Sequence, residues 1–223
     1  MTGDSMQVLD QQQEIARAAI RRLRPPVWKR TIDIVASMLL VLCFLPLFLV
    51  VAAWIKCVSR GPVFFRQLRV GHGGNLFPII KFRTMHSDSN ATENHREYLR
   101  NLEPSEPFAK PEIASRLIAG GGLIRKCSID ELPQLWNVLF GDMSLVGPRP
   151  DVMMLQDYKT NRELRRFEVQ PGITGLWQVS GKNSLSYDEM IDLDLRYIDH
   201  LSLWNDCSIM LRTFRVLVNQ DNN

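Results

Sequence analysis

The sequence predicts an α+β fold that is mostly α, with a membrane helix near the N-terminus and a small α/β domain on the cytosolic side of the membrane. Two observations carry this prediction. The 22 residues from Ile34 to Ile55 contain no charged side chain, and the rest of the chain combines short strands with amphipathic helices. A length of 223 residues suits one domain with a small attachment. We expect a polar extension at 1–27, a membrane helix at 28–60 and one domain at 61–223.

Residues 8–24 have the pattern of a polar helix with arginines near its end, stopped by Pro25 and Pro26. This segment holds too few large apolar residues to form a core, so we expect it to lie on the surface. Gln, Glu and Arg dominate it, and no small-residue cleavage site follows an early apolar run. We therefore expect no signal peptide.

The uncharged run is long enough to cross a membrane, because 22 helical residues span roughly 33 Å against a hydrocarbon core of about 30 Å. Two features argue against a simple crossing. Pro46 removes a helix hydrogen bond near mid-depth, and basic residues stand on both flanks, which places both flanks in the cytoplasm. We therefore predict a helix that is kinked at Pro46 and re-enters the same leaflet. The flanking bases are Arg21, Arg22, Arg24, Lys29, Arg30, Lys56, Arg60, Arg66 and Arg69.

The composition argues against several classes of protein. The formal net charge is only +3 and the bases form no long tract, so nucleic acid is not an expected partner. The cysteines form no C-x-x-C pair and the histidines lack ligand spacing, which argues against a zinc site and a disulfide framework. A reduced protein that faces the cytosol fits these observations. The residues concerned are Cys43, Cys57, Cys127, Cys207, His72, His86, His95 and His200.

Residues 62–70 and 76–84 are separated by a glycine-rich stretch at 71–75, which predicts a β-hairpin. Lys81 and Arg83 lie in its second strand. Two interpretations stay open for them: solvated bases on an edge strand, or side chains that contact a phosphate group. The next residues, 86–112, are polar, and we expect a mobile excursion there with a short helix near 93–102.

Two adjacent carboxylates, Asp130 and Glu131, are the candidate site. They follow two bases, Arg125 and Lys126, and open an apolar pattern that is typical of one buried helix face. One interpretation is helix capping, because Ser128 and Glu131 have the spacing of a capping box and Asp130 itself suits an N-cap. As an N-cap, Asp130 would hold its side chain at the surface, where a substrate reaches it. The alternative to capping alone is a pair of functional carboxylates. The apolar positions are Leu132, Leu135, Trp136 and Leu139.

The loop at 141–150 favours the second alternative, since it is too rigid and too polar for a simple helix connection. Prolines on both sides of Arg149 restrict the backbone and so preorganise the side chain. An ordinary surface arginine between two prolines is the competing interpretation. Together with Arg125 and Lys126, Arg149 would bracket the carboxylates and bind an anionic, phosphorylated substrate.

After Pro150 we expect an amphipathic helix through Arg166, a turn at 171–175 and a short strand at 176–179. A helix begins again at Ser186, which has capping-box spacing with Glu189. This helix contains Asp192-Leu193-Asp194, the D-x-D pattern of many metal-dependent glycosyltransferases, but side chains two positions apart on a helix point apart. The last helix, at 203–218, mixes apolar and basic residues and suits either the membrane interface or the core.

The stretch at 129–150, I-D-E-L-P-Q-L-W-N-V-L-F-G-D-M-S-L-V-G-P-R-P, resembles the bacterial sugar transferases known as monotopic phosphoglycosyl transferases. The match is long and specific, and further motifs extend it from about Trp28 to the end of the chain. The sequence departs from common family patterns at Leu45, where a serine often precedes the proline, and at Lys182, where an arginine is common. The further motifs are Lys29-Arg30-x-x-Asp33, Pro46, Gln67-x-Arg69-x-Gly71, Lys81-Phe82-Arg83-Thr84-Met85 and Pro171-Gly172-Ile173-Thr174-Gly175-x-x-Gln178-Val179.

The resemblance implies an enzyme at the cytoplasmic face of a bacterial inner membrane. Such an enzyme moves a sugar-1-phosphate from a UDP-sugar to polyprenyl (undecaprenyl) phosphate and releases UMP, as the first membrane step of polysaccharide or glycoconjugate assembly. The implied partners are the UDP-sugar, the polyprenyl phosphate and membrane lipid, and the formation of a homo-oligomer stays open. The sequence does not disclose which sugar is transferred.

The resemblance also implies roles for individual residues. Asp130 would form a covalent phosphosugar-aspartate and hold Mg²⁺ together with substrate phosphates, because the available ligands are oxygens. Glu131 would assist it by positioning or proton handling. Arg125 and Arg149 would stabilise charge on the transferred phosphoryl group, and the resemblance places Lys81 and Arg83 near the substrate.

Two rival functions stay open. One is a metal-dependent glycosyltransferase that uses the D-x-D at Asp192 and makes a sugar-lipid bond without an intervening diphosphate. The other is a non-catalytic membrane scaffold in polysaccharide assembly. The intact set of Asp130, Glu131 and Arg149 argues against the scaffold.

Overall fold

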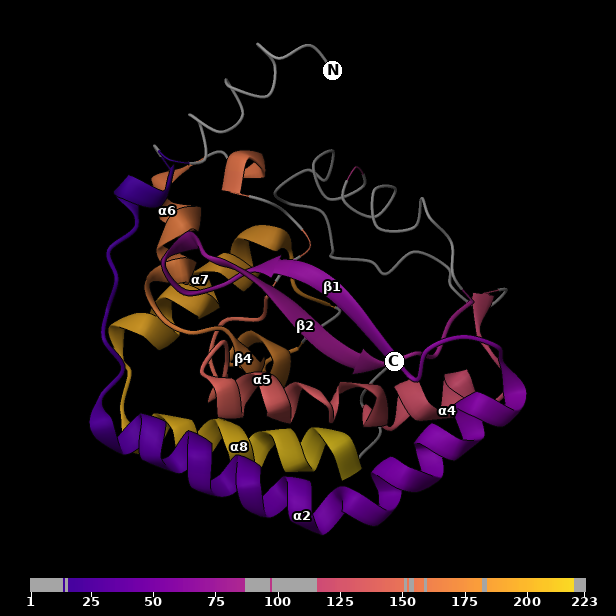
Figure 1. The fold of residues 1–223 in the computed structure, drawn as a ribbon. Coiled ribbons are helices and arrows are strands. Elements are labelled where there is room, and N and C mark those ends of the chain that lie inside the picture. The colour runs from indigo at the N-terminus through magenta and orange to yellow at the C-terminus, as the bar shows by residue number, and fades with distance from the viewer. Residues whose placement is uncertain are drawn as a thin grey trace.

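A computed structural model describes residues 14, 16–86, 97, 116–150, 152, 155–158, 160–181 and 184–218 of the chain. It is mostly helical with two small sheets, as the sequence predicts. Its longest element is helix α2, Val27–Val58, which has 32 residues and contains Pro46. In Figure 1, α2 runs along one side of the molecule and bends near its middle, and both of its ends lie toward the rest of the domain.

Helix α2 is the one described helix that is long and apolar enough to cross a membrane, by length and composition. One narrow face of it packs against the domain, through Lys29, Asp33, Ser37 and Val41 before the proline and through Phe48, Val51 and Ile55 after it. The remaining surface carries large apolar side chains that are each at least 36% exposed. Such a continuous apolar surface is typical of contact with lipid or with another protein. The exposed residues are Ile34, Val35, Met38, Leu39, Leu40, Leu42, Leu45, Leu49, Val50 and Trp54.

The predicted hairpin is confirmed. Strands β1, Phe64–Val70, and β2, Leu76–Phe82, pair antiparallel and are joined by a short turn, η1, at His72–Gly74. The turn needs glycine because Gly73 and Gly74 have φ of 64° and 77°. A second sheet consists of two short parallel strands, β3, Ser144–Val146, and β4, Gly172–Thr174.

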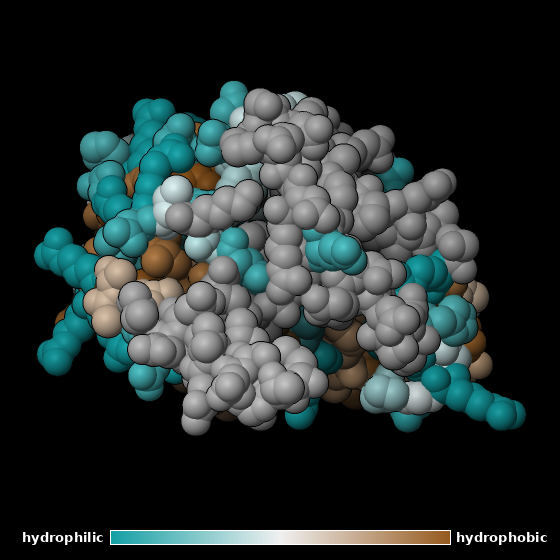
Figure 2. Space-filling view, turned by 90° about the horizontal axis from the view of Figure 1, so that it is seen from above, coloured by the Kyte–Doolittle hydropathy of each residue, from teal (hydrophilic) through white to brown (hydrophobic). Residues whose placement is uncertain are grey.

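Short helices fill the space between α2 and the hairpin. They are α4, Gly121–Lys126, the 3₁₀ turn η3, Ile129–Glu131, and α5, Gln134–Phe140. Two longer helices, α7, Tyr187–Asp199, and α8, Leu203–Val218, close the domain, and α8 runs beside α2 (Figure 1). On the face opposite α2 the described side chains are mostly hydrophilic, with apolar ones between them (Figure 2).

The main core lies where α5, α7 and α8 meet the two sheets. Burying these side chains supplies most of the driving force for folding, about 25 cal/mol for each Å² of apolar surface removed from water. One smaller cluster joins Ile20 and Val70 to apolar residues between 152 and 167, and another lies between α2, the end of β2 and α4. The core side chains with the least exposure include Val138, Met143, Val146, Ile191, Tyr197 and Ile209.

A buried cluster of polar residues joins α2 to the domain; we call Lys29, Asp33, Tyr197 and Asp206 the anchor cluster. Lys29 Nζ donates to Asp206 Oδ2 at 2.6 Å and to the Val146 carbonyl at 2.9 Å. The Tyr197 hydroxyl lies 2.9 Å from Asp206 Oδ1 and 3.0 Å from the same carbonyl. Asp33 Oδ1 accepts from the backbone N–H of Leu145 at 2.9 Å and from the Ser144 hydroxyl at 3.0 Å. The cluster therefore fixes α2, β3 and α8 to one another.

Two predictions for the second half of the chain are wrong. The helix expected from Pro150 to Arg166 is three short pieces, because the Thr160 capping box starts a new helix and Arg166 and Phe167 turn into the core. The strand expected at 176–179 is a 3₁₀ turn, η6, Trp177–Val179, and the strand lies earlier, at β4. Packing of Trp177 into the core overrides its strand propensity. The three pieces are η4, Leu155–Asp157, α6, Asn161–Leu164, and η5, Arg165–Glu168.

Two other helix predictions are confirmed. Ser186 and Glu189 form the expected capping box at the start of α7, and α8 has the predicted bounds of 203–218. The N-terminal helix expected at 8–24 is helical at residues 14 and 16–19 and has ended by Ile20, so it stops earlier than expected. The helix expected near 93–102 lies outside the described residues except at position 97, and Lys182 lies outside them too.

Candidate active site

The carboxylate pair lies in a tight turn between α4 and α5. Among the described non-glycine residues, Ser128 is the one with positive φ, at 56°, and this left-handed residue turns the chain into η3. The capping prediction is wrong, because the Ser128 side chain makes no capping hydrogen bond with any described residue. Helix α5 begins at Gln134 after Pro133, so Asp130 is not its N-cap. The two acids are therefore not explained by helix capping.

Glu131 is held by two cations. Arg149 Nη2 donates to its Oε1 at 2.5 Å and Nη1 donates to Oε2 at 3.1 Å, which makes a two-pronged pair. Lys81 Nζ donates to Oε1 at 2.8 Å. Burial raises the pKa of Glu131, but the charges and hydrogen bonds of Arg149 and Lys81 outweigh burial and hold this pKa well below its usual range. Glu131 is therefore an ionised carboxylate with both oxygens engaged.

Asp130, its neighbour, has the opposite environment. It is 6% exposed, so the prediction that it lies openly on the surface is wrong. Burial and the charge of Glu131 raise the pKa of Asp130 to about 6, although Lys81, Arg125 and Arg149 lower it in part. No described residue donates a hydrogen bond to its carboxylate. Asp130 is thus a carboxylate near several cations that keeps its oxygens unengaged.

Lys81 is brought to the site by the hairpin, opposite Phe65 in the strand register. Its ammonium group is largely buried against Glu131, which contradicts the solvated edge-strand interpretation for this residue. Burial lowers the pKa of Lys81, Glu131 raises it again, and the nearby Arg149 lowers it further. The Lys81 ammonium group, which water would solvate strongly, is therefore held away from water beside the carboxylates.

Of two further arginines that the sequence suggested for the site, Arg125 lies near the carboxylates and Arg83 does not. Arg125, in the last turn of α4, is close enough to lower the pKa of Asp130, and among the described residues it donates one long hydrogen bond of 3.5 Å to the Met85 sulfur. Arg83 does not join the site. It is 6% exposed and donates to the Pro62 carbonyl at 2.6 Å and to Ser59 Oγ at 2.8 Å. Since Arg83 follows the last residue of β2, its side chain swings to the end of α2 and ties the hairpin to that helix.

Two arginines that were not expected at the site hold the loop that carries Arg149. Arg69 donates to the Pro150 carbonyl at 3.2 Å, and its charge lowers the pKa of Lys81. Arg166 is fully buried and donates to the Arg149 carbonyl at 3.1 Å and to Asp194 Oδ2 at 2.8 Å. The motif Gln67-x-Arg69-x-Gly71 was the sequence signal for Arg69. The two arginines therefore hold the adjacent backbone carbonyls of Arg149 and Pro150.

Glycine is required where this loop passes β4. A Cβ on Gly147 would come 2.4 Å from the Gln170 carbonyl oxygen, and one on Gly172 would come 2.1 Å from the Gly147 nitrogen. Neither contact is tolerable, and both neighbours are backbone atoms that have little room to move. Any side chain at Gly147 or Gly172 would therefore push the Arg149 loop away from the carboxylates.

The described residues do not form a protein cage for a metal, since no three of their His, Cys, Asp and Glu side chains come together. The donor set still fits Mg²⁺, which is commonly bound by one carboxylate together with substrate phosphates and water. Asp130 offers that carboxylate, while the oxygens of Glu131 are engaged by Arg149 and Lys81.

The D-x-D pair does not form a metal site. Asp192 is exposed and is paired with Arg162, whereas Asp194 is 1% exposed and is paired with Arg166. The two side chains point to different sides of α7, as the sequence predicts. This arrangement argues against the metal-dependent glycosyltransferase.

Known proteins resemble the chain over most of its length. A family model described as bacterial sugar transferase matches residues 24–220. The chain is 41% identical over 211 residues to the undecaprenyl-phosphate galactose phosphotransferase of Salmonella typhimurium, a match that covers 86% of this chain and 41% of that relative. It is also 41% identical over 203 residues to the UDP-glucose:undecaprenyl-phosphate glucose-1-phosphate transferase of Caulobacter vibrioides, which covers 87% of this chain and 71% of the relative.

Relatives of different lengths share this similarity. The exopolysaccharide production protein ExoY of Rhizobium meliloti is 39% identical over 189 residues, and the match covers 83% of each chain. In contrast, the chain spans about two fifths of the Salmonella relative, 41%, and of an uncharacterized sugar transferase of Haemophilus influenzae, 43%.

Proposed function

The chain belongs to the bacterial sugar transferase family, and we propose that it transfers a sugar-1-phosphate from a UDP-sugar to polyprenyl phosphate and releases UMP. The observation that carries this proposal is the asymmetry of the carboxylate pair. Both oxygens of Glu131 accept hydrogen bonds from Arg149 or Lys81. Asp130 lies near the same cations, but its oxygens accept no hydrogen bond from a described residue. Groups whose surroundings push their pKa values apart are typical of acid, base and nucleophile assignments in active sites.

Asp130 is the nucleophile in this proposal. One of its carboxylate oxygens attacks the β-phosphorus of the UDP-sugar, and the bond from that phosphorus to the bridging oxygen breaks, so that UMP leaves with the bonding electrons. A phosphosugar-aspartate remains. An oxygen of the polyprenyl phosphate then attacks the same phosphorus, and the Asp130 carboxylate leaves. The product is a polyprenyl diphosphate sugar, and Asp130 returns to its starting state.

The neighbouring residues prepare this attack. Glu131 orients Arg149 and Lys81, and its low pKa makes it a poor carrier of protons. In the proposed reaction, charge builds up on the phosphoryl group near Arg149 and Arg125, and preorganised cations there would lower the barrier. When bound, Mg²⁺ would offset the negative charge of the diphosphate. Asp130 and the substrate phosphates are the groups that would hold it.

The proposal places the protein at the cytoplasmic face of the bacterial inner membrane, where the lipid acceptor is found. The bend of α2 and the direction of its two ends support a helix that enters and leaves the same leaflet (Figure 1). The exposed apolar surface of α2 would then face lipid. Cysteines introduced at positions 25 and 60 should be labelled equally from the cytoplasm, and opposite labelling would restore a simple crossing.

A product assay tests the reaction. The full chain is incubated in detergent with undecaprenyl phosphate, Mg²⁺ and a panel of UDP-sugars that starts with UDP-galactose and UDP-glucose, the sugars in the names of two relatives. We expect UMP and a lipid that carries two phosphates per sugar. Release of UDP with one phosphate per lipid would instead indicate the glycosyltransferase, and no turnover with any sugar would favour the scaffold.

A further inference from the structure

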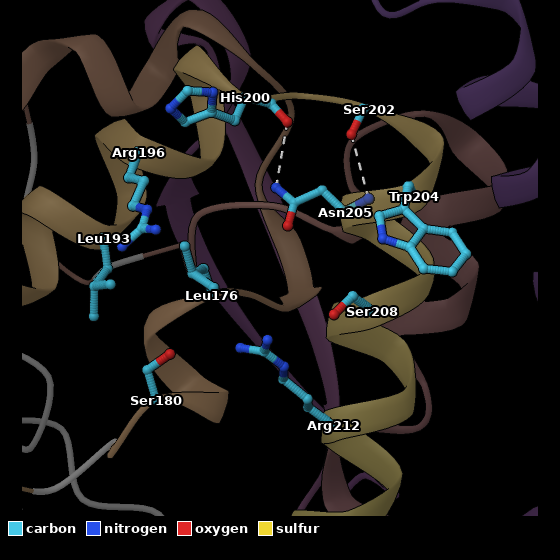
Figure 3. Close-up of a pocket in the computed structure, with 10 residues that line it drawn as sticks. All are labelled: Leu176, Ser180, Leu193, Arg196, His200, Ser202, Trp204, Asn205, Ser208 and Arg212. Atoms are coloured by element: carbon cyan, nitrogen blue, oxygen red, sulfur yellow. Dashed lines mark hydrogen bonds between the residues drawn. The ribbon is translucent and has the colours of Figure 1, made fainter.

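A cavity of about 440 Å³ lies between α7 and α8, away from the carboxylate pair. We call it the α7–α8 cavity. Arg196 of α7 and Arg212 of α8 extend into it from opposite walls, on either side of Leu176 (Figure 3). The proposed transfer reaction uses none of its lining. The other lining residues are Ser180, Leu193, His200, Ser202, Trp204, Asn205 and Ser208.

The charge of the cavity is not compensated. Its ten described lining residues include two arginines and no carboxylate. The described acids of α7 beyond its first turn are all committed elsewhere, Asp192 to Arg162, Asp194 to Arg166 and Asp199 to Arg165. Neither Arg196 nor Arg212 forms an ion pair with a residue that the structure describes. Two unpaired guanidinium groups at one concave site favour a bound anion.

Hydroxyl and backbone groups shape the rest of the site. In Figure 3 the Ser208 hydroxyl points into the cavity. The turn before α8 is held by the Asn205 backbone N–H, which donates to Ser202 Oγ at 3.3 Å, and by Asn205 Nδ2, which donates to the His200 carbonyl at 3.4 Å. These two hydrogen bonds hold the turn at the rim of the cavity in place without a ligand.

The surroundings of the cavity indicate which kind of molecule carries the anion. Trp204, Ser208 and Arg212 follow one another at intervals of four along α8, so they form one ridge. Beside that ridge α8 exposes an apolar stripe, in which Trp204 is 84%, Leu211 69% and Phe214 68% exposed. The anchor cluster fixes α8 against α2, whose uncovered surface is also apolar. A tryptophan between an apolar stripe and a basic cavity is typical of the depth of lipid headgroups.

We propose that the α7–α8 cavity binds the phosphate of an anionic phospholipid headgroup, with Arg196 and Arg212 as its ligands and Ser208 as a further donor. The acyl chains of that lipid would lie along Trp204 and Leu211. None of the cavity's lining residues belongs to the carboxylate pair or to the cations around it. The proposal rests on the contact of α2 with lipid and not on the transfer reaction, so the experiment measures binding instead of turnover.

The test is native mass spectrometry of the full chain in detergent, titrated with dioctanoyl-phosphatidylglycerol. We expect one lipid to bind in preference to further ones. The double variant Arg196→Gln/Arg212→Gln should bind it roughly 10- to 100-fold more weakly, because two charge-assisted contacts are lost. The matched control is Arg66→Gln/Arg215→Gln, which removes two exposed positive charges outside the cavity and should stay within about twofold of the parent.

A second variant keeps the charges and blocks the space. Ser208→Trp places an indole in the cavity with both arginines intact and should weaken the lipid by a similar factor. Thermal unfolding in the same detergent shows that each variant is folded, so a loss of binding is assigned to the site.

Four results would overturn the proposal. They are equal binding by the control and the cavity variants, equal binding of dioctanoyl-phosphatidylcholine, retention of the lipid by Ser208→Trp, and binding of inorganic phosphate at the same arginines without binding of the lipid. The last result would identify a site for a soluble anion.

Discussion

The anchor cluster and the carboxylate pair are both buried groups of opposite charges, and they differ in how completely their members are engaged. In the anchor cluster Lys29 and Asp206 are 3% and 5% exposed, and each has two partners within 3.0 Å. At the carboxylate pair Glu131 is engaged in the same way, but Asp130 is not. The charged groups of the anchor cluster all have hydrogen-bond partners, whereas at the carboxylate pair the Asp130 oxygens have no donor among the described residues. We call Asp130 the open carboxylate.

This difference separates a structural role from a chemical one. A buried charge with full hydrogen bonding fixes the arrangement of the elements that supply its partners. A buried carboxylate without donors destabilises the fold, because its charge is costly away from water. A destabilising carboxylate such as Asp130 is explained if its free oxygens react with a ligand. Substitutions in the two clusters should separate these roles, and the largest effect is expected at Asp130.

The largest effect should come from Asp130→Asn. The carboxamide keeps the shape of the side chain but is a very poor nucleophile, so UMP release should fall by about 10⁴-fold or more. The measurement is the turnover of UDP-sugar in the presence of undecaprenyl phosphate. An Asp130→Asn protein that keeps most of its activity would show that the open carboxylate has no chemical role.

Breaking the anchor cluster should act on stability instead. Lys29→Met leaves Asp206 buried without its cation, and removal of one partner of a buried pair costs roughly 3–5 kcal/mol. We expect a large fall in the midpoint of thermal unfolding, and a fall in activity only in proportion to the folded protein that is lost. The surface arginine variant Arg162→Met, which breaks exposed pairs with Asp188 and Asp192, is the control and should change stability by less than about 1 kcal/mol. A stable but inactive Lys29→Met protein would contradict the division of roles.

Arg149→Ala should lower the rate, as Asp130→Asn does, but by a smaller factor. The loss of a preorganised cation beside the transferred phosphoryl group lowers rates by roughly 10² to 10³. Arg149→Lys keeps the charge but not the two-pronged pair with Glu131, so we expect it to recover only part of the rate. Steady-state rates should be divided by the folded fraction. If activity then equals that of the parent protein, the ordinary surface role for Arg149 is correct.

Asp130 also makes stability depend on pH. Its pKa is raised from 3.8 to about 6, so the folded state is penalised as the pH rises through this range, and the full penalty above pH 6 is at most roughly 3 kcal/mol. Removing the charge should therefore stabilise the fold. Asp130→Asn should raise the unfolding midpoint by several degrees at pH 8, with a gain that shrinks toward zero as the pH is lowered toward 4. A gain that is the same at both pH values would argue against a raised pKa.

Local patterns in the sequence predicted the elements whose cause is local. The hairpin follows from its glycine turn, α7 from its capping box and α8 from its apolar pattern. The break of the helix after Pro150 was missed, because it depends on how Arg166 and Phe167 pack against distant residues. Local signals do not report such tertiary contacts.

The site shows the same division. The sequence named Asp130, Glu131, Arg125, Arg149 and Lys81 as candidates, and the structure brings these five residues together. Which cation reaches which carboxylate was not predicted, since that depends on a hairpin, a turn and a loop that meet only in the fold. Arg83 illustrates the limit: it is two positions from Lys81, yet it binds Ser59 at the end of α2.

The most direct test of the open carboxylate is the intact mass of the protein after incubation with UDP-sugar and Mg²⁺ in the absence of a lipid acceptor. We expect an adduct heavier by one sugar phosphate, with one UMP released per adduct and the modified peptide mapped to Asp130. Glu131→Gln should still form some adduct, more slowly, because its role is to position the cations. If the parent protein gains no mass while it releases UMP only when both substrates are bound, or if Asp130→Asn forms the same adduct, the covalent role of Asp130 is wrong.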